Sequence, residues 1–230
     1  MKCWGTMFII FVDGVIACGK TSLLRAIAEK EIPNWYIYEE PITKYRQYFQ
    51  YNPLDIQYKS PCDSSIVQLL FSQIQHSRLT EIIKRHSHTD DVLICERNLG
   101  STQCFNDAFL SEGLHSKFTH KFIHETIKAY EQTLIFDTCK LFFLDIPLEV
   151  TKARINERGR PEEIDTRIDL DKRQELLTNA YKSYIIDFRD RYGPESIKIC
   201  NIYHDLEAVV KSLIDFYKDS VAKKKNVKSS

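Results

Sequence analysis

The sequence predicts an α/β fold in which a doubly wound, five-stranded parallel sheet carries helices on both faces. Short apolar runs alternate with longer stretches of helical period, and neither an internal repeat nor a long linker divides the 230 residues. Such strand–helix alternation is typical of a mostly parallel sheet. We therefore expect one domain over residues 1–217, followed by a basic, disordered tail over residues 218–230.

The five predicted strands are short and rich in β-branched or aromatic residues. The first, Met7–Val12, is apolar at every position, which indicates a strand buried on both faces. The other four strands are predicted at Trp35–Tyr38, Val92–Cys95, Leu141–Leu144 and Ile197–Cys200. Apolar spacings of three and four residues predict helices at Lys20–Glu29, Ser64–Arg85, Thr102–Phe109, Lys117–Thr133, Asp169–Arg191 and His204–Tyr217.

The composition excludes several classes of protein. Lysine and arginine together equal aspartate and glutamate at 32 each, so no overall charge attracts a nucleic acid. No segment approaches the roughly 20 apolar residues that cross a bilayer, and Met7–Val12 ends at Asp13, too short for a signal peptide. Seven scattered cysteines without a C-x-x-C pair indicate a reducing compartment. We expect a cytoplasmic protein without nucleic-acid or membrane partners.

A phosphate-binding loop follows the first predicted strand. Residues 14–21 match the pattern G-x-x-x-x-G-K-[ST], and a helix with an apolar face comes next. The backbone amides of such a loop surround phosphate oxygens, Lys20 reaches the β- and γ-phosphates, and Thr21 ligates Mg²⁺. The predicted ATP-binding residues of this segment are Gly14, Val15, Ile16, Ala17, Cys18, Gly19, Lys20, Thr21 and Ser22.

Three charged segments lie just past predicted strands or helices. Glu39-Glu40-Pro41 follows the second strand, and Glu96-Arg97-Asn98 follows the third. Residues 154–163 form a dense run of arginines and glutamates that begins at the end of a helix. Open α/β sheets bind their ligands at the carboxyl ends of their strands, so the first two segments are candidates for one site.

Together with the phosphate loop, these segments resemble the deoxyribonucleoside kinases, the family of thymidine, deoxycytidine and multi-substrate kinases. The resemblance runs from Met7 to about Glu163. It implies ATP and Mg²⁺ as partners, a homodimer, and transfer of phosphate to a nucleoside 5′-hydroxyl for nucleotide salvage. It implies that Glu40 is the general base and that Arg97 holds substrate and base. It also implies a lid over about residues 154–165, in which Arg154, Arg158 and Arg160 close over ATP.

The resemblance extends to the substrate pocket and the metal. It implies that Glu96 joins Thr21 at Mg²⁺ and that Lys20 takes part in catalysis. Thr102 stands where cytosine-preferring members carry an aspartate and thymidine-preferring members an alanine, which favours thymidine or broad pyrimidine use. The implied substrate-binding residues are Glu40, Tyr45, Tyr58, Gln68, Arg97, Thr102 and Glu163. Tyr45 replaces a usual tryptophan, Asn98 a serine, and Ala17 a loop glycine.

Some alternatives stay open. Adjacent strand residues face opposite sides, so Glu39 and Glu40 do not share one task, and we favour Glu40 because it directly precedes the proline. Thymidylate kinase is the nearest rival, although no R-E-P-G-G segment lies near position 40. A GTPase switch would need an N-K-x-D motif, which the sequence lacks, and a coupled ATPase would need a glutamate after Asp145.

Overall fold

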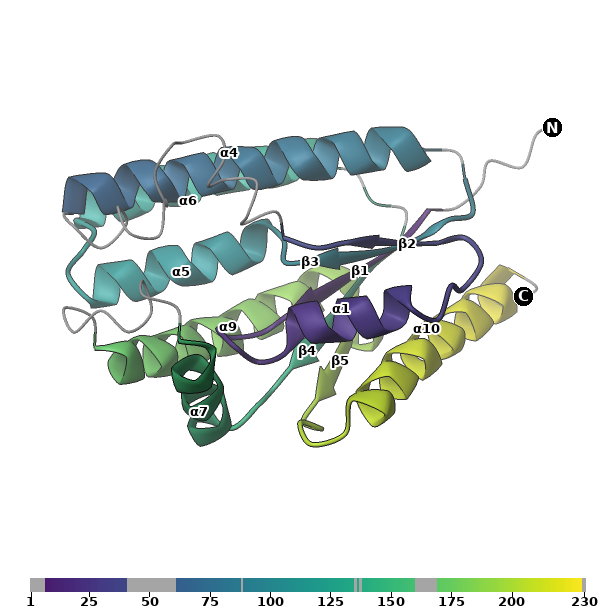
Figure 1. The fold of residues 1–230 in the computed structure, drawn as a ribbon. Helices are drawn as coiled ribbons and strands as arrows, with labels where there is room; N and C mark the ends of the chain where they lie inside the picture. The colour runs from purple at the N-terminus through teal and green to yellow at the C-terminus, as the bar shows by residue number, and fades with distance from the viewer. Residues whose placement is uncertain are drawn as a thin grey trace.

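The computed structural model describes residues 7–40, 61–87, 89–134, 136, 138–159 and 169–228. Its centre is a five-stranded sheet with strand order β2-β3-β1-β4-β5, in which each neighbouring pair is parallel (Figure 1). The strands are β1 (Phe8–Asp13), β2 (Trp35–Tyr38), β3 (Val92–Glu96), β4 (Thr138–Leu144) and β5 (Ile197–Cys200). The predicted doubly wound parallel sheet is therefore confirmed, and each strand begins and ends within three residues of its predicted bounds.

Helices cover both faces of the sheet. They are α1 (Lys20–Ala28), α4 (Pro61–His86), α5 (Leu99–Ser111), α6 (Lys117–Thr133), α7 (Leu148–Arg158), α9 (Leu170–Tyr192) and α10 (Leu206–Lys228), with a short 3₁₀ helix, η1 (Pro194–Ser196). Neighbouring residues of β4 show the two layers, because successive side chains of a strand point to opposite faces. Phe142 contacts Phe216 of α10, whereas Phe143 contacts Tyr181 of α9.

The central strands are buried on both faces, as their continuous apolar sequence predicts. All six residues of β1 are buried, and β4 is buried from Cys139 to Leu144. The edge strand β5 differs, because Lys198 and Ile199 lie exposed. A charged residue on an edge strand discourages pairing with another sheet. Because β1 and β3 are neighbours, their carboxyl ends bring Asp13 beside the residues that follow Glu96.

Several helices differ from their predicted bounds, and α5 and α10 differ most. Helix α5 begins at Leu99 rather than Thr102, because Asn98 and Ser101 cap each other: Oδ1 of Asn98 accepts from the Ser101 amide, and Oγ of Ser101 accepts from the Asn98 amide. Helix α10 continues past Tyr217 to Lys228, so the expected disordered tail is helical through that residue. Val221 packs against the core and extends the apolar face of the helix.

The described part of the chain contains no helix long and apolar enough to cross a membrane. Residues 160–168, which include the second half of the predicted lid, lie outside the described residues.

The contact between α5 and α9 generates a stability prediction at Gly100, in the first turn of α5. An alanine Cβ at this position would lie 2.1 Å from Cε2 of Tyr184, far inside van der Waals contact. Alanine normally stabilises a helix relative to glycine by about 0.5–1 kcal/mol. We expect the opposite sign for G100A, a loss of about 1–3 kcal/mol in the free energy of unfolding, measured by urea denaturation. Adding Tyr184→Leu should restore part of the loss, and a G100A variant as stable as the wild type would contradict this packing.

Candidate functional site

The phosphate loop lies between the carboxyl end of β1 and the first turn of α1. Gly14 has a φ of 148°, and a Cβ there would lie 2.7 Å from both the sulfur of Cys18 and the carbonyl oxygen of Leu144. Only glycine fits this close approach. Gly19 caps α1 with a φ of 104°, so the first amides of α1 are available to an anion. Ala17 has a φ of 60°, which explains the glycine that the family usually carries there.

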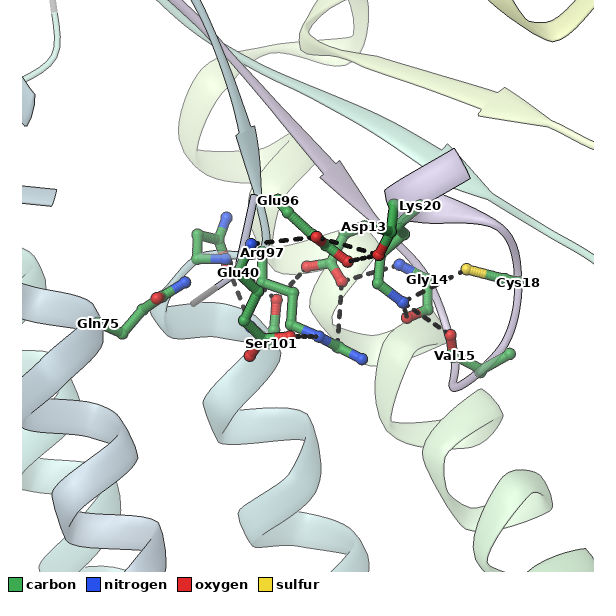
Figure 2. Close-up of polar contacts among 12 residues, drawn as sticks. Asp13, Gly14, Val15, Cys18, Lys20, Glu40, Gln75, Glu96, Arg97 and Ser101 are labelled. Carbon is green, nitrogen blue, oxygen red and sulfur yellow. Dashed lines mark hydrogen bonds and ion pairs between the residues drawn. The ribbon is translucent and has the colours of Figure 1, made fainter. Parts of the chain in front are cut away.

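The Lys20 side chain points into the loop rather than into solvent. The residue is 5% exposed, and its Nζ donates to the carbonyl oxygens of Gly14 at 3.1 Å and Val15 at 2.9 Å. Figure 2 shows this ammonium group among the loop residues, with the sulfur of Cys18 at 3.5 Å. A cation in this position can bind phosphate oxygens that the loop amides surround. Of the remaining loop positions, Val15 is buried, Ile16 is half-buried and Ser22 is exposed.

The two predicted metal ligands lie in contact with each other. Oγ1 of Thr21 donates to the Glu96 carboxylate, at 3.0 Å from Oε1 and 3.3 Å from Oε2. The Glu40 backbone amide also donates to Oε2 of Glu96 at 3.1 Å. One hydroxyl and one carboxylate beside a phosphate loop suit Mg²⁺, which binds through a few oxygen ligands and keeps places for phosphate and water. The described residues contain no cluster of three or more His, Cys, Asp or Glu side chains that could hold a metal alone.

Glu40 and Arg97 form an ion pair just past the ends of β2 and β3. Nε of Arg97 donates to Oε2 of Glu40 at 3.0 Å, and the Glu40 side chain is 20% exposed. Burial raises the pKa of the Glu40 carboxyl and the nearby Glu96 raises it further, whereas Arg97 opposes the shift. A carboxylate with a raised pKa that stays partly open to solvent is suited to accept a proton.

Arg97 is held by residues that the sequence pattern did not identify. Its Nη1 donates to the Tyr181 hydroxyl at 2.8 Å and lies 3.6 Å from Oδ1 of Asp13. Asp13 is fully buried, and its carboxylate accepts from the Tyr181 hydroxyl, the Gly14 amide and the Ser101 hydroxyl. Figure 2 shows Asp13, Glu40, Glu96 and Arg97 converging beside the loop. The one sequence signal for Asp13 is a charge that ends an otherwise apolar strand.

A second unpredicted residue, Arg78 of α4, joins the ends of β2 and β3. Its Nη2 donates to the carbonyl oxygens of Tyr38 at 3.0 Å and Glu96 at 3.1 Å, and its Nη1 donates to Oε1 of Gln75. These carbonyl groups belong to the last residues of the two strands, next to the segments that carry Glu40 and Arg97. Arg78 therefore holds together the ends of the two strands, and the residues of the Glu40–Arg97 ion pair follow these ends closely in the sequence.

The two predicted base-reading residues lie together. Nε2 of Gln68 donates to the backbone carbonyl oxygen of Thr102 at 2.6 Å, and both residues are buried. They come from α4 and α5, so the sequence placed them far apart while the fold brings them into contact. The predicted residues Tyr45, Tyr58, Arg160 and Glu163 lie outside the described residues.

The two adjacent glutamates that follow β2 have different partners. Glu39 pairs with Arg25 of α1, at 3.0 Å between Oε1 and Nε, and both side chains are well exposed. This exposed pair contrasts with Glu40, whose carboxylate meets the buried guanidinium of Arg97.

Two arginines of the predicted lid, Arg154 and Arg158, lie on α7. Arg154 contacts the phosphate loop: its Nη1 donates to the carbonyl oxygen of Cys18 at 3.2 Å, and its Nη2 donates to that of Tyr203 at 2.7 Å. Arg158 is exposed at the end of the helix. Another unpredicted contact comes from Gln174 of α9, whose Nε2 donates to the carbonyl oxygen of Ile16 at 3.0 Å.

Three solved structures of deoxyadenosine kinase from M. mycoides are similar to the chain. The structure with the products dCMP and a flexible dCDP has a TM-score of 0.69 at 16% identity, covering 92% of this chain and 100% of that chain. The structure with dCTP has a TM-score of 0.68 at 16% identity, with the same two coverages. The structure with dATP has a TM-score of 0.71 at 15% identity, covering 91% and 98%. At these identities the likeness shows the fold.

No curated protein sequence matches the chain significantly. A family model described as deoxynucleoside kinase matches residues 10–226, from the middle of β1 to the last turns of α10. The match confirms the resemblance that the loop and the charged segments indicated. The chain belongs to the deoxynucleoside kinase family of enzymes.

Proposed function

We propose that the chain transfers the γ-phosphoryl group of ATP to the 5′-hydroxyl of a deoxyribonucleoside, with a preference for pyrimidines and above all thymidine. Membership of the family supports phosphorylation of a nucleoside. The proposal adds the 5′-hydroxyl as the acceptor group, ATP as the phosphoryl donor and the preference for pyrimidine bases. The observation that carries it is the Glu40–Arg97 ion pair, which lies next to the Thr21–Glu96 contact of the phosphate loop. The product would be a deoxynucleoside monophosphate for nucleotide salvage.

On the acceptor side, Glu40 takes the proton of the attacking hydroxyl. A 5′-hydroxyl is a weak nucleophile, so a carboxylate must remove its proton as the bond to phosphorus forms. The Arg97 guanidinium keeps the Glu40 carboxylate in one orientation, and partial burial makes that carboxylate more basic than an exposed one.

On the donor side, the loop amides and Lys20 bind the phosphate oxygens and stabilise the charge that spreads over them during transfer. Thr21 and Glu96 would hold Mg²⁺, which neutralises phosphate charge when it is bound with ATP. Arg154 already contacts the loop, and we include Arg158 and Arg160 with it as lid residues over ATP. A closed lid excludes water that would otherwise hydrolyse ATP.

The cations near Glu40 argue against thymidylate kinase, the main alternative. A monophosphate acceptor needs positive groups to bind its phosphate. Arg97 donates to Glu40 and Tyr181, and Arg78 donates to backbone carbonyl groups and Gln75. These two arginines therefore already bind protein groups. This favours a neutral hydroxyl group, rather than a phosphate group, as the part of the substrate that lies here.

The base preference rests on Gln68 and Thr102. Thr102 has no charge to pair with the exocyclic amine of cytosine, and the Gln68 amide nitrogen donates to the Thr102 carbonyl group, which holds the two residues together. The similar solved structures are named deoxyadenosine kinases, and their bound ligands include dATP as well as dCTP. Purine nucleosides therefore belong in any test of the preference.

The remaining parts of the proposal concern assembly, domain organisation and location. We keep a homodimer, a single kinase domain and a cytoplasmic location as predictions. The substrate roles of Tyr45, Tyr58 and Glu163 likewise stay predictions.

Replacement of Glu40 tests the assignment of the base. Glu40→Gln keeps the size of the side chain and removes its ability to accept a proton. We expect kcat to fall by about 10²–10⁴-fold, with a much smaller change in the KM for the nucleoside. The measurement is steady-state Mg-ATP turnover with thymidine.

The neighbouring residue provides the matched control. Glu39→Gln removes the same charge from an exposed ion pair with Arg25, whose attraction is screened by solvent. We expect its kcat to stay close to that of the wild type. A larger loss in Glu39→Gln than in Glu40→Gln would move the general base to Glu39.

A substrate panel tests the acceptor and the base. Thymidine, deoxycytidine, deoxyadenosine, deoxyguanosine and thymidine monophosphate are compared by kcat/KM under the same Mg-ATP conditions. We expect thymidine to give the highest value and the purine nucleosides lower ones, because Thr102 offers no charged partner to an exocyclic amine. Preference for deoxyadenosine would overturn the pyrimidine assignment, and turnover of thymidine monophosphate alone would overturn the 5′-hydroxyl as acceptor.

A further inference from the structure

Tyr181 of α9 is a fully buried tyrosine whose hydroxyl lies between a carboxylate and a guanidinium group. The hydroxyl donates to Oδ1 of Asp13 at 2.8 Å and accepts from Nη1 of Arg97 at 2.8 Å. Its ring packs against Phe143 of β4, with 5.2 Å between the ring centroids. A hydroxyl has one proton to donate, so the acceptor on Asp13 fixes the direction of both hydrogen bonds.

Arg97 needs partners that hold its position. The residue has a φ of 61°, a conformation that costs free energy in a residue other than glycine and persists when its surroundings fix it. Nε binds Glu40, Nη1 binds Tyr181, and the guanidinium group lies 5.1 Å from the centroid of the Phe105 ring. Among these contacts, the hydroxyl of Tyr181 is the acceptor nearest to Nη1, since Oδ1 of Asp13 is 3.6 Å away.

The same carboxylate also reaches the donor side of the site. Oδ1 of Asp13 accepts from the Gly14 amide at 2.8 Å, at the first residue of the phosphate loop. Tyr181 therefore connects the start of the loop, through Asp13, with the arginine that binds Glu40. Three parts of the chain that are far apart in the sequence, namely β1, the residue after β3 and α9, meet at this one hydroxyl.

We propose that Tyr181 is a positioning residue for phosphoryl transfer: its hydroxyl, oriented by Asp13, holds Arg97 in the place from which Nε binds Glu40. Tyr181 acts through Arg97 and needs no contact with the substrate. The inference rests on the proposed function, because it assigns Glu40 the role of general base. It adds a residue that lies on α9, outside the loop and the charged segments.

A matched control lies one turn further along the same helix. The side chain of Tyr184 is half-buried, and its hydroxyl accepts from Nδ2 of Asn98 at 2.6 Å. Tyr181→Phe and Tyr184→Phe each remove one hydroxyl oxygen that makes a hydrogen bond and leave the ring in place. Only the first changes a partner of Arg97.

The first experiment compares steady-state kinetics of the two variants. Loss of a hydrogen bond to a charged group is expected to lower kcat of Tyr181→Phe by about 10- to 100-fold. The KM for ATP should change by less than about threefold, since the loop keeps its own phosphate contacts. Tyr184→Phe should keep kcat within about threefold of the wild type. Equal losses of kcat in both variants would reduce Tyr181 to a structural role.

A double-mutant cycle asks whether Tyr181 acts through the base. In a Glu40→Gln background the base is already absent, so adding Tyr181→Phe should lower the residual rate by less than about threefold. A full additional loss of about 10- to 100-fold in that background would show that the two residues act independently and would overturn the proposal.

Nuclear magnetic resonance supplies a readout that does not depend on turnover. The Nε–H signal of Arg97, identified by its loss in Arg97→Lys, should shift or broaden in Tyr181→Phe and stay in place in Tyr184→Phe. An unchanged signal in Tyr181→Phe would overturn the positioning role. A wild-type protein that phosphorylates no nucleoside would instead contradict the proposed function, while this signal would still decide whether Tyr181 positions Arg97.

Discussion

The fully buried carboxylate of Asp13 is the constraint around which the site is organised. A charge removed from water has to be surrounded by hydrogen-bond donors, because an unpaired one costs several kcal/mol or more. The donors come from four elements: the Gly14 amide of the phosphate loop, Ser101 of α5, Tyr181 of α9 and, at a longer distance, Arg97 after β3. The hydrogen bonds to this one carboxylate bring the loop, two helices and Arg97 together.

The parallel sheet provides the frame in which those partners meet. Because β2, β3 and β1 run in the same direction, the segments after them emerge at one edge, with Tyr38 beside Cys95 and Val12 beside Glu96. Arg78 then ties the last carbonyl groups of β2 and β3 together from α4. Glu40 and the phosphate loop, which are far apart in the sequence, thereby both contact the Glu96 carboxylate.

Local patterns identified most of the frame and part of the site. The loop glycines, Lys20 and Thr21 form a contiguous motif whose chemistry follows from backbone geometry, and the continuous apolar run of β1 indicates a central strand. The sequence also predicted different tasks for Glu39 and Glu40, and in the structure these residues, which lie just past β2, pair with different arginines. By contrast, the start of α5 was missed because its capping pair, Asn98 and Ser101, is a polar signal that precedes the apolar spacing.

The sequence by itself determined the α/β class, the phosphate loop and the charged segments, because each is encoded within a few consecutive residues. The tertiary structure alone decided that Tyr181 and Asp13 hold Arg97, that Arg78 ties the strand ends, and that Gln68 meets Thr102. These contacts join residues from different elements, and no spacing along the chain encodes them. They depend on how the helices pack on the sheet. A buried charged group needs hydrogen-bond partners, and the packing decides which elements supply them.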